Sequence, residues 1–329
     1  MTCRFCKAES EYVHLPTERF YCNEECLRLY GVFKEWKTQQ PSLIKTESTT
    51  TPKESFHDIV MRTGGYPVHA AHRGGSGVFA PENTIYAFKK SVENGARLLE
   101  LDLRLTRDKH LVLLHWSTID ETTSHKGAIS DYTLAQLEEV DAGYHYEELK
   151  GTGIRIPTFK EFMDTFVPMR DLLFFFDFKD LLTLRMALKV IESYQIDGRF
   201  MLGSVIGDVN DYIIRYRDAL LEQGPRIPVC TDIVQTFKLT IGYYLDLLDL
   251  YHFEHDVYGF VLCSPTAHFW CKDMVDTLHS YGCRVTVSGY GNEMNKAERL
   301  QECIDFGVDF IMTDRPDLLQ SLLNKKGLT

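Results

Sequence analysis

The segment Leu98-Leu99-Glu100-Leu101-Asp102-Leu103-Arg104-Leu105 alternates leucine with charged residues from its second position onward. Because successive side chains of a β-strand point to opposite faces, this pattern predicts a strand with leucines on one face and with Glu100 and Asp102 together on the other. A lone buried carboxylate costs several kcal/mol unless it is paired or holds a metal. We therefore expect the two acids to converge with other groups on something positive.

Apolar runs of strand length recur along most of the chain on both sides of this segment. They are Val68–Ala71, Leu111–Leu114, Leu172–Phe178, Phe200–Val205, Ile227–Ile233, Tyr258–Cys263, Arg284–Val287 and Val308–Thr313. Helical patterns separate several of them, at Thr84–Asn94, Leu134–Val140, Thr183–Tyr194, Lys272–Tyr281 and Asn295–Phe306. Strand–helix alternation over roughly 260 residues predicts a parallel α/β architecture, and a TIM-type (β/α)8 barrel of about 250 residues fits the length.

One connection does not fit a regular barrel. The link from Leu105 to Leu111 is too short for a helical crossover, because a parallel return needs about a dozen residues. The nine candidate strands therefore predict an irregular barrel, without identifying the additional strand.

The chain divides into three predicted regions. Residues 66–329 form the barrel, residues 37–65 form a linker, and residues 1–36 form a small separate module. The linker is assigned because Thr38–Ser55 is rich in polar residues, contains two prolines and lacks periodicity.

Composition excludes several classes of function. The net charge of −11 argues against a nucleic-acid-binding surface, which needs clustered Lys and Arg. No apolar run approaches the roughly 18 to 20 residues that span a bilayer, and the polar start is not a secretory signal. Nine cysteines, with four of them in the first 26 residues, indicate metal binding and free thiols in a reducing compartment. We expect an intracellular, cytoplasmic protein.

The four amino-terminal cysteines have the spacing of a tetrahedral zinc site. They are Cys3, Cys6, Cys22 and Cys26. A module of some 36 residues cannot fold on an apolar core alone, which favours Zn²⁺ over unlinked free thiols. The segment Tyr21–Cys26 resembles treble-clef or MYM/TRASH-type zinc modules, and His14 is an alternative ligand. Because the basic residues of the module are balanced by glutamates, we expect its partner to be an unidentified protein and not a nucleic acid.

Polar residues stand at the ends of several predicted barrel strands. His72 and Arg73 follow the run Val68–Ala71, and His115 follows Leu111–Leu114. Asp177 interrupts the aromatic run Phe174–Phe178, and Lys179 follows that run directly. The carboxyl ends of barrel strands meet at one mouth, so we expect these groups to meet Glu100 and Asp102 there.

The chain also resembles the glycerophosphodiester phosphodiesterase family over about residues 66–320. The resemblance lies in the order and spacing of these segments: His72–Gly75, Pro81–Thr84, Glu100–Asp102, Thr106–Asp108, His115, Asp120–Thr123, Gly127, Ser130–Leu134, Ile156–Thr158, Gly307–Asp309 and Thr313–Asp317.

This resemblance implies a barrel enzyme, a phosphoric diester hydrolase, that cleaves a phosphodiester attached to glycerol. It implies a metal held by Glu100, Asp102 and Asp177, with His72 and His115 as the acid–base pair. The implied substrates are glycerophosphodiesters or lysophospholipids, which would yield a glycerol phosphate or lysophosphatidate and an alcohol.

Three features of the sequence depart from the family pattern and bear on substrate contacts. Asp177 stands where a longer Glu is usual, Trp116 replaces the Asp after the second His, and Thr286–Gly289 lacks the usual Trp.

The chemistry of the residues agrees with phosphodiester cleavage. Three carboxylates suit Mg²⁺ or Ca²⁺ better than zinc. Arg73 and Lys179 can bind phosphate oxygens, and two histidines can supply a base and an acid near neutral pH. Glu82 is expected to orient Arg73 or the substrate, or else to cap the helix that starts near Thr84.

Two alternatives differ from this interpretation. One is an enzyme similar to phosphatidylinositol phospholipase C, which also uses two histidines on a barrel. The other is a non-catalytic sensor or adaptor built on a decayed barrel, which Trp116 and Asp177 would favour and the intact His72/His115 pair argues against.

Overall fold

The computed structural model describes residues 12–14, 19–21, 55–62, 64–194, 196, 198–220, 227–251, 253–262, 271–289 and 293–328. Near the amino terminus, β1 (Tyr12–His14) and β2 (Arg19–Tyr21) pair antiparallel. The predicted zinc ligands Cys3, Cys6, Cys22 and Cys26 lie outside the described residues.

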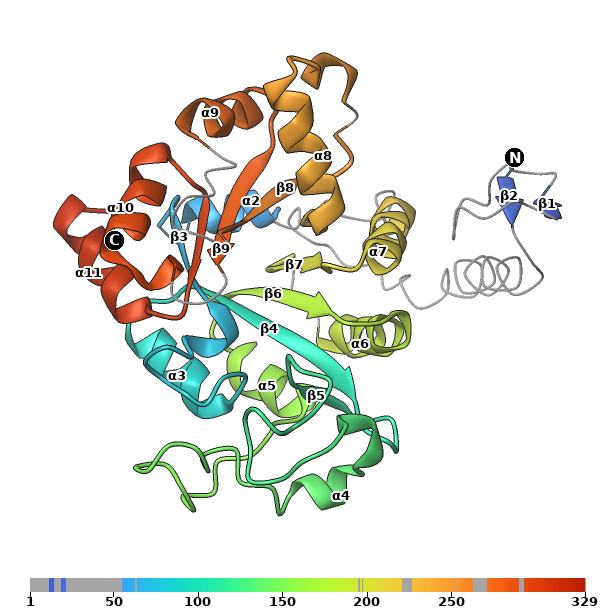
Figure 1. The fold of residues 1–329 in the computed structure, drawn as a ribbon, viewed down its shortest axis with the longest axis vertical. Helices are drawn as coiled ribbons and strands as arrows, with labels where there is room; N and C mark the ends of the chain where they lie inside the picture. The colour runs from blue at the N-terminus through green and yellow to red at the C-terminus, as the bar shows by residue number, and fades with distance from the viewer. Residues whose placement is uncertain are drawn as a thin grey trace, which may run out of the picture.

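A sheet of parallel strands forms the centre of the molecule (Figure 1). In spatial order its strands are β7 (Phe200–Gly203), β6 (Leu173–Phe178), β4 (Leu98–Leu105), β3 (Val68–Ala71), β10 (Phe310–Thr313), β9 (Arg284–Gly289) and β8 (Val257–Leu262). Bridges from Leu202 to Val229 and from Cys230 to Val257 link its two ends, β7 and β8. The predicted α/β class is confirmed, and the linked ends are consistent with a TIM-type barrel.

The additional strand is β5 (Leu111–Leu113), which pairs antiparallel with β4. The short link after Leu105 is thus a hairpin and not a crossover. The run predicted as a strand at Ile227–Ile233 makes only the two bridges, and Ile233 is already the first residue of a helix.

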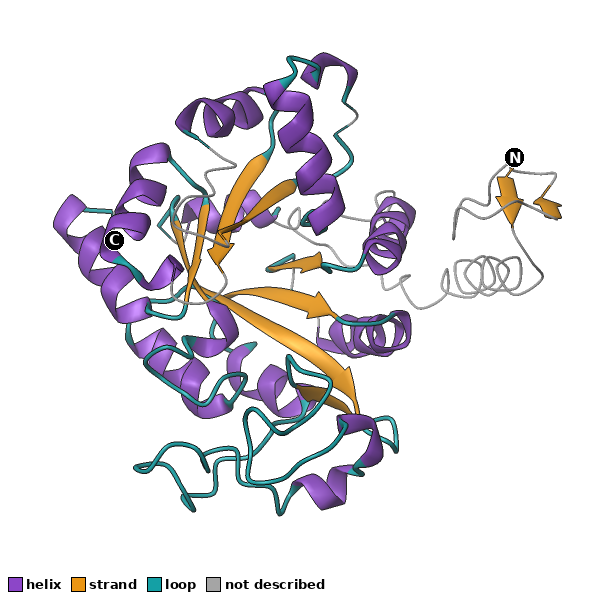
Figure 2. Cartoon of the chain, viewed as in Figure 1, coloured by secondary structure: helices purple, strands orange, loops and turns teal. Residues whose placement is uncertain are grey.

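Helices lie on the outside of the strands (Figure 2). They are α3 (Ile85–Glu93), α4 (Leu134–Leu137), α5 (Phe159–Phe166), α6 (Leu181–Tyr194), α7 (Gly207–Leu220), α8 (Ile233–Tyr244), α9 (Lys272–Ser280), α10 (Ala297–Phe306) and α11 (Pro316–Lys326). Threonine side chains cap the first turns of α3 and α5, since Thr84 accepts from the backbone N–H of Ala87, and Thr158 forms a capping box with Glu161. No helix in the described ranges is long and apolar enough to cross a bilayer.

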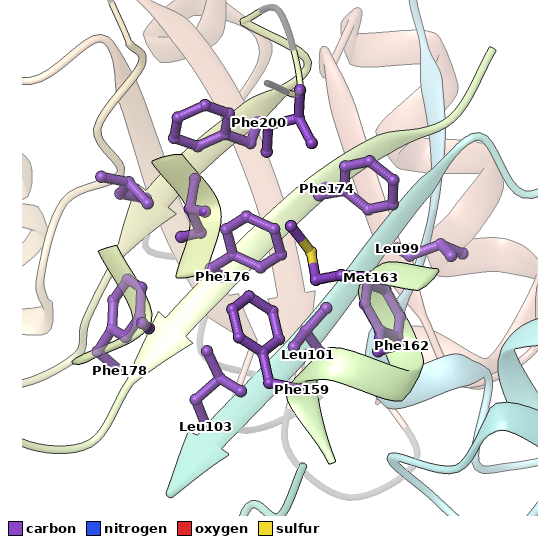
Figure 3. Packing of buried hydrophobic residues seen from close by; sticks show 14 of the residues in the cluster. Leu99, Leu101, Leu103, Phe159, Phe162, Met163, Phe174, Phe176, Phe178 and Phe200 are labelled. Carbon is purple, nitrogen blue, oxygen red and sulfur yellow. The ribbon is translucent and has the colours of Figure 1, made fainter. Parts of the chain in front are cut away.

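The alternation in β4 separates two sides of the sheet. Leu99, Leu101 and Leu103 pack outward against α5 and against three phenylalanines of β6, Phe174, Phe176 and Phe178 (Figure 3). Leu98 points to the opposite, inner side of the curved sheet, where it belongs to a second hydrophobic core. Glu100 and Asp102 therefore share this inner side, as the sequence predicts.

The outer core contains many aromatic contacts, and removing one of its rings is expected to lower the stability of the protein. Phe176 is fully buried, with its ring 5.4 Å from that of Phe159 at a nearly perpendicular angle. We expect Phe176→Ala to lower the free energy of unfolding by about 3–5 kcal/mol, because a large cavity is left between β6 and α5. Urea unfolding measures this, with the exposed Leu182→Ala expected to change it by less than about 0.5 kcal/mol. Equal effects of the two changes would contradict the packing described.

The described chain includes a helix inside the predicted linker. Residues Phe56–Arg62 form α2, and Phe56, Ile59 and Val60 are buried in the inner core against Val68. Their i, i+3, i+4 spacing is a helical apolar stripe that the polar composition of the preceding residues obscures. The packing of the barrel thus starts before residue 66.

Candidate active site

Strand register brings the three predicted metal ligands together. Asp102 in β4 and Asp177 in β6 are direct partners across the parallel pair, and Glu100 lies two residues before Asp102 on the same face. One carboxylate oxygen from each of the three lies within 4.8 Å of the others. The predicted convergence of strand carboxylates is present.

Lys179 lies among these acids. Its Nζ is 2.6 Å from Oδ1 of Asp102 and 2.6 Å from Oδ2 of Asp177. Burial lowers the pKa of Lys179, but the two carboxylates outweigh burial and leave this pKa above its ordinary value. Burial raises the pKa of Asp102, while Lys179 and Arg73 outweigh it and hold this pKa well below the ordinary value.

The other two acids are harder to ionise, because burial raises the pKa of both Glu100 and Asp177. Burial, followed by the charge of Asp102, raises the pKa of Glu100 to about 8. Oδ1 of Asp177 is buried and has no hydrogen-bond partner in the part of the chain that the structure describes. Buried carboxylate oxygens lacking a partner suit a hard divalent cation, so the donor set fits Mg²⁺ or Ca²⁺.

Arg73 is held against the same acids by a turn with unusual backbone geometry. It lies in a short 3₁₀ turn, His72–Gly74, with φ of 50°, and its backbone N–H donates to Oε2 of Glu100 at 2.9 Å. Its guanidinium lies 3.2 Å from Oε2 of Glu82 and 3.5 Å from Oδ2 of Asp102. Glu82 thus contacts Arg73 and caps no helix: the cap of α3 is Thr84.

His72 is oriented by a residue from the far end of the chain. Its Nδ1 lies 2.8 Å from Oδ1 of Asp314, which also accepts a hydrogen bond from Ser76 at 3.0 Å. Burial lowers the pKa of His72, but the hydrogen bond to Asp314 and the charge of Glu100 outweigh it and leave this pKa raised. Asp314 lies within the motif Thr313–Asp317, yet sequence reasoning assigned it no role.

The hairpin after β4 positions His115. The backbone N–H of Leu114 donates to the carbonyl oxygen of Asp102 at 3.0 Å, and the Arg104 guanidinium donates to the His115 carbonyl at 2.7 and 2.9 Å. Burial lowers the pKa of His115 to about 3. Its Nδ1 is buried with no hydrogen-bond partner among the described residues. The neighbouring Trp116 ring lies 4.5 Å from the imidazole, edge to face.

Asn83 is a further residue of this cluster that sequence reasoning missed. Its side-chain Nδ2 donates to Oδ2 of Asp102 at 2.9 Å, and its side-chain Oδ1 accepts from the Asp102 backbone N–H at 3.2 Å. Its φ is 55°, a left-handed conformation that Asn tolerates better than most residues. The signal was available in the segment Pro81–Thr84, where a polar Asn precedes the helix cap.

These side chains line one pocket of about 290 Å³. Seven of the predicted residues contribute to it: His72, Arg73, Glu100, Asp102, His115, Asp177 and Lys179. Glu82 contacts Arg73 without appearing in the lining. The opposite wall comes from the turn after β7, from α8 and from β8 and β9, and includes Val205, Ile233, Phe237 and Phe260. Cys230 also lines the pocket, and Cys230, Cys271, Cys283 and Cys303 are free thiols, as expected.

Comparison with known proteins agrees with this geometry. Residues 72–192 match the model of the Glycerophosphoryl diester phosphodiesterase family. A glycerophosphodiester phosphodiesterase of Caldanaerobacter subterraneus subsp. tengcongensis is 31% identical over 262 residues, which are 78% of this chain and 98% of that protein.

Solved structures share the fold at lower identity. A glycerophosphoryl diester phosphodiesterase domain from Mycobacterium tuberculosis has a TM-score of 0.63 at 21% identity, covering 78% of this chain and 98% of that one. A phosphodiesterase of Oleispira antarctica, solved in complex with the product sn-glycerol-3-phosphate, has a TM-score of 0.60 at 20% identity, covering 78% and 97%. With a relative of 31% identity aligned over nearly its whole length, the sequence-based prediction is confirmed: the chain belongs to the glycerophosphodiester phosphodiesterase family.

Proposed function

We propose that the protein hydrolyses glycerophosphodiesters to a glycerol phosphate and an alcohol, in a reaction that requires a divalent cation. The observation that supports this most directly is the convergence of three carboxylates, two histidines, Arg73 and Lys179 on one pocket. The names of the Caldanaerobacter relative and the product bound to the Oleispira enzyme support the same substrate class.

Glu100, Asp102 and Asp177 would hold the cation, Mg²⁺ or Ca²⁺. When bound, the cation would neutralise phosphate charge and acidify the attacking hydroxyl or water. Arg73 would bind a remaining phosphate oxygen, because its contacts with Glu82 and with Asp102 fix the direction of its guanidinium. Lys179 would keep Asp102 and Asp177 ionised, and it would add a second positive charge near the phosphate.

The two histidines would divide the proton transfers. Asp314 binds Nδ1 of His72, which leaves Nε2 for the substrate and stabilises the protonated ring. We therefore assign to His72 the donation of a proton to the leaving oxygen. His115, whose surroundings favour the neutral ring, would accept the proton of the nucleophile.

The test is direct. Purified protein is incubated with soluble glycerophosphodiesters and Mg²⁺ or Ca²⁺, and glycerol phosphate and the free alcohol are quantified with and without EDTA. We expect both products in equal amounts, and only with the cation. A cyclic phosphate product would indicate the phospholipase C alternative, and no turnover of any diester would favour the adaptor.

Lysophospholipids are proposed as a second substrate group. The pocket wall opposite the carboxylates carries Val205, Ile233 and Phe237, which can contact an acyl chain while the phosphodiester lies at the acids. The expected products are lysophosphatidate and the headgroup alcohol.

We also propose that Cys3, Cys6, Cys22 and Cys26 hold one Zn²⁺ in a module separate from catalysis. Their spacing supports this, and β2 ends at Tyr21, next to Cys22. Removing residues 1–54 should abolish zinc content and leave the specific activity largely intact, because every residue assigned to catalysis lies at or beyond His72. The truncation keeps Ser55, whose hydroxyl hydrogen-bonds Asp58 at the start of α2.

Elemental analysis and diesterase assays of both forms measure this outcome. Unchanged zinc content after truncation would exclude the four cysteines as the site. A truncated form that melts cooperatively but is inactive would place the module in the catalytic unit. The intracellular location and the protein partner of the module stay predictions.

A further inference from the structure

Helix α8 exposes apolar side chains where a barrel helix ordinarily presents polar ones. The α8 apolar face consists of residues that are each 45% to 61% exposed: Ile233, Val234, Phe237, Ile241, Tyr244 and Leu245. Within Ile233–Tyr244 the charged residue is Lys238, and the helix has no acid. Figure 1 shows α8 at the periphery of the molecule, beside β8. A contiguous exposed apolar surface of this kind marks an interaction site more often than scattered single residues do.

The orientation of α8 is set by contacts on its other side. The Asp232 side chain caps the helix by accepting from the backbone N–H of Gln235 at 2.8 Å. Leu239 is fully buried in the core formed with β8 and β9. The helix thus already has an inward apolar side, and the α8 apolar face is a second one directed to the surface.

The α8 apolar face is continuous with the pocket. Ile233 and Phe237 belong to this face and also line the pocket that holds Glu100 and His115. Val205, in the turn after β7, is half exposed and lines the same pocket. Whatever covers this face therefore meets the pocket mouth.

The continuity of the α8 apolar face with the pocket indicates which kind of partner covers this face. A protein or a second copy of the chain seated on Ile233 and Phe237 would cover the mouth and hinder substrate entry. A lipid layer would instead bring phosphodiester headgroups to the mouth. The chain has a net charge of −11, and only Lys238 on this helix could attract anionic lipid, so an uncharged or zwitterionic layer suits it best.

We propose that the α8 apolar face is a lipid-contact surface that sets the pocket mouth on the acyl boundary of zwitterionic lipid. The choice of lipid as occupant depends on the proposed diesterase function, whereas binding itself can be measured without turnover.

The experiment measures partitioning of the full chain to phosphatidylcholine vesicles by flotation, in EDTA to prevent hydrolysis. The test variant is the double change Val234→Gln and Ile241→Gln, because neither residue lines the pocket and Gln favours a helix. The matched control is Met61→Gln, an equally exposed apolar position on α2. We expect the double variant to partition on the order of tenfold more weakly, since two apolar contacts with lipid are lost, and the control to match wild type.

The outcomes separate this proposal from the diesterase proposal. The double variant should keep wild-type turnover of a soluble glycerophosphodiester and lose activity on lysophosphatidylcholine presented in vesicles. Absence of wild-type partitioning, or partitioning unchanged in the double variant, would overturn the lipid surface whatever the activity. A concentration-dependent dimer lost in the double variant, without vesicle binding, would make a second copy the occupant. Vesicle binding without turnover of any diester would leave the surface standing and defeat the diesterase proposal.

Discussion

Replacing Glu100 with Gln is expected to abolish turnover of glycerophosphodiesters while the protein stays folded. Glu100 is buried, and burial together with the charge of Asp102 raises its pKa to about 8, so its ionised form is favoured only when a cation is bound beside it. A cation held by the three carboxylates would supply several kcal/mol of charge stabilisation, which corresponds to roughly a thousandfold or more in rate. Gln cannot supply that charge, yet it fills the same volume.

The measurement combines steady-state turnover, Mg²⁺ or Ca²⁺ binding by calorimetry, and thermal melting. Glu93→Gln, at an exposed position on α3, is the matched control and should leave turnover and cation binding unchanged. Asp102→Asn should also be inactive, but it removes the partner of Lys179 and Arg73 and should lower the melting temperature as well. Full turnover by protein shown by elemental analysis to be free of metal would refute the cation requirement.

Replacing His72 or His115 with Ala is expected to lower kcat by at least about 10²-fold. KM should change less, because a general acid or base acts mainly in the transition state. The two variants should differ on a diester with a nitrophenol leaving group, which departs without protonation. His72→Ala should regain most of its turnover on that substrate, and His115→Ala should not.

The control is His110→Ala, since His110 is an exposed histidine outside the pocket lining. It should retain wild-type kcat on both substrates. Rescue of His115→Ala in place of His72→Ala would exchange the two roles. Near wild-type turnover by either catalytic variant on the natural diester would remove that residue from the acid–base pair.

Local patterns predicted most of the catalytic side of the pocket. In β4, alternation along a strand is enough to place Glu100 and Asp102 on one face, and the parallel register then sets Asp177 opposite Asp102. The same local logic located the bounds of most strands to within a few residues. The prediction of bounds was less accurate where an apolar run ended in a helix, as at Ile227–Ile233. A short apolar run does not by itself distinguish a strand from a helix.

The sequence by itself determined the fold class, the family and seven residues of the pocket, because strand alternation is set by near neighbours and the order of the motifs can be read along the chain without knowing the fold. Only the tertiary structure decided that Asp314 holds His72 across 242 positions, that Asn83 holds Asp102, and that β5 is the strand that pairs antiparallel with β4. The apolar side of α8 that faces the surface also needed the fold. These features depend on how the strands close on one another, and that closure is set by packing over the whole chain, which no short segment contains.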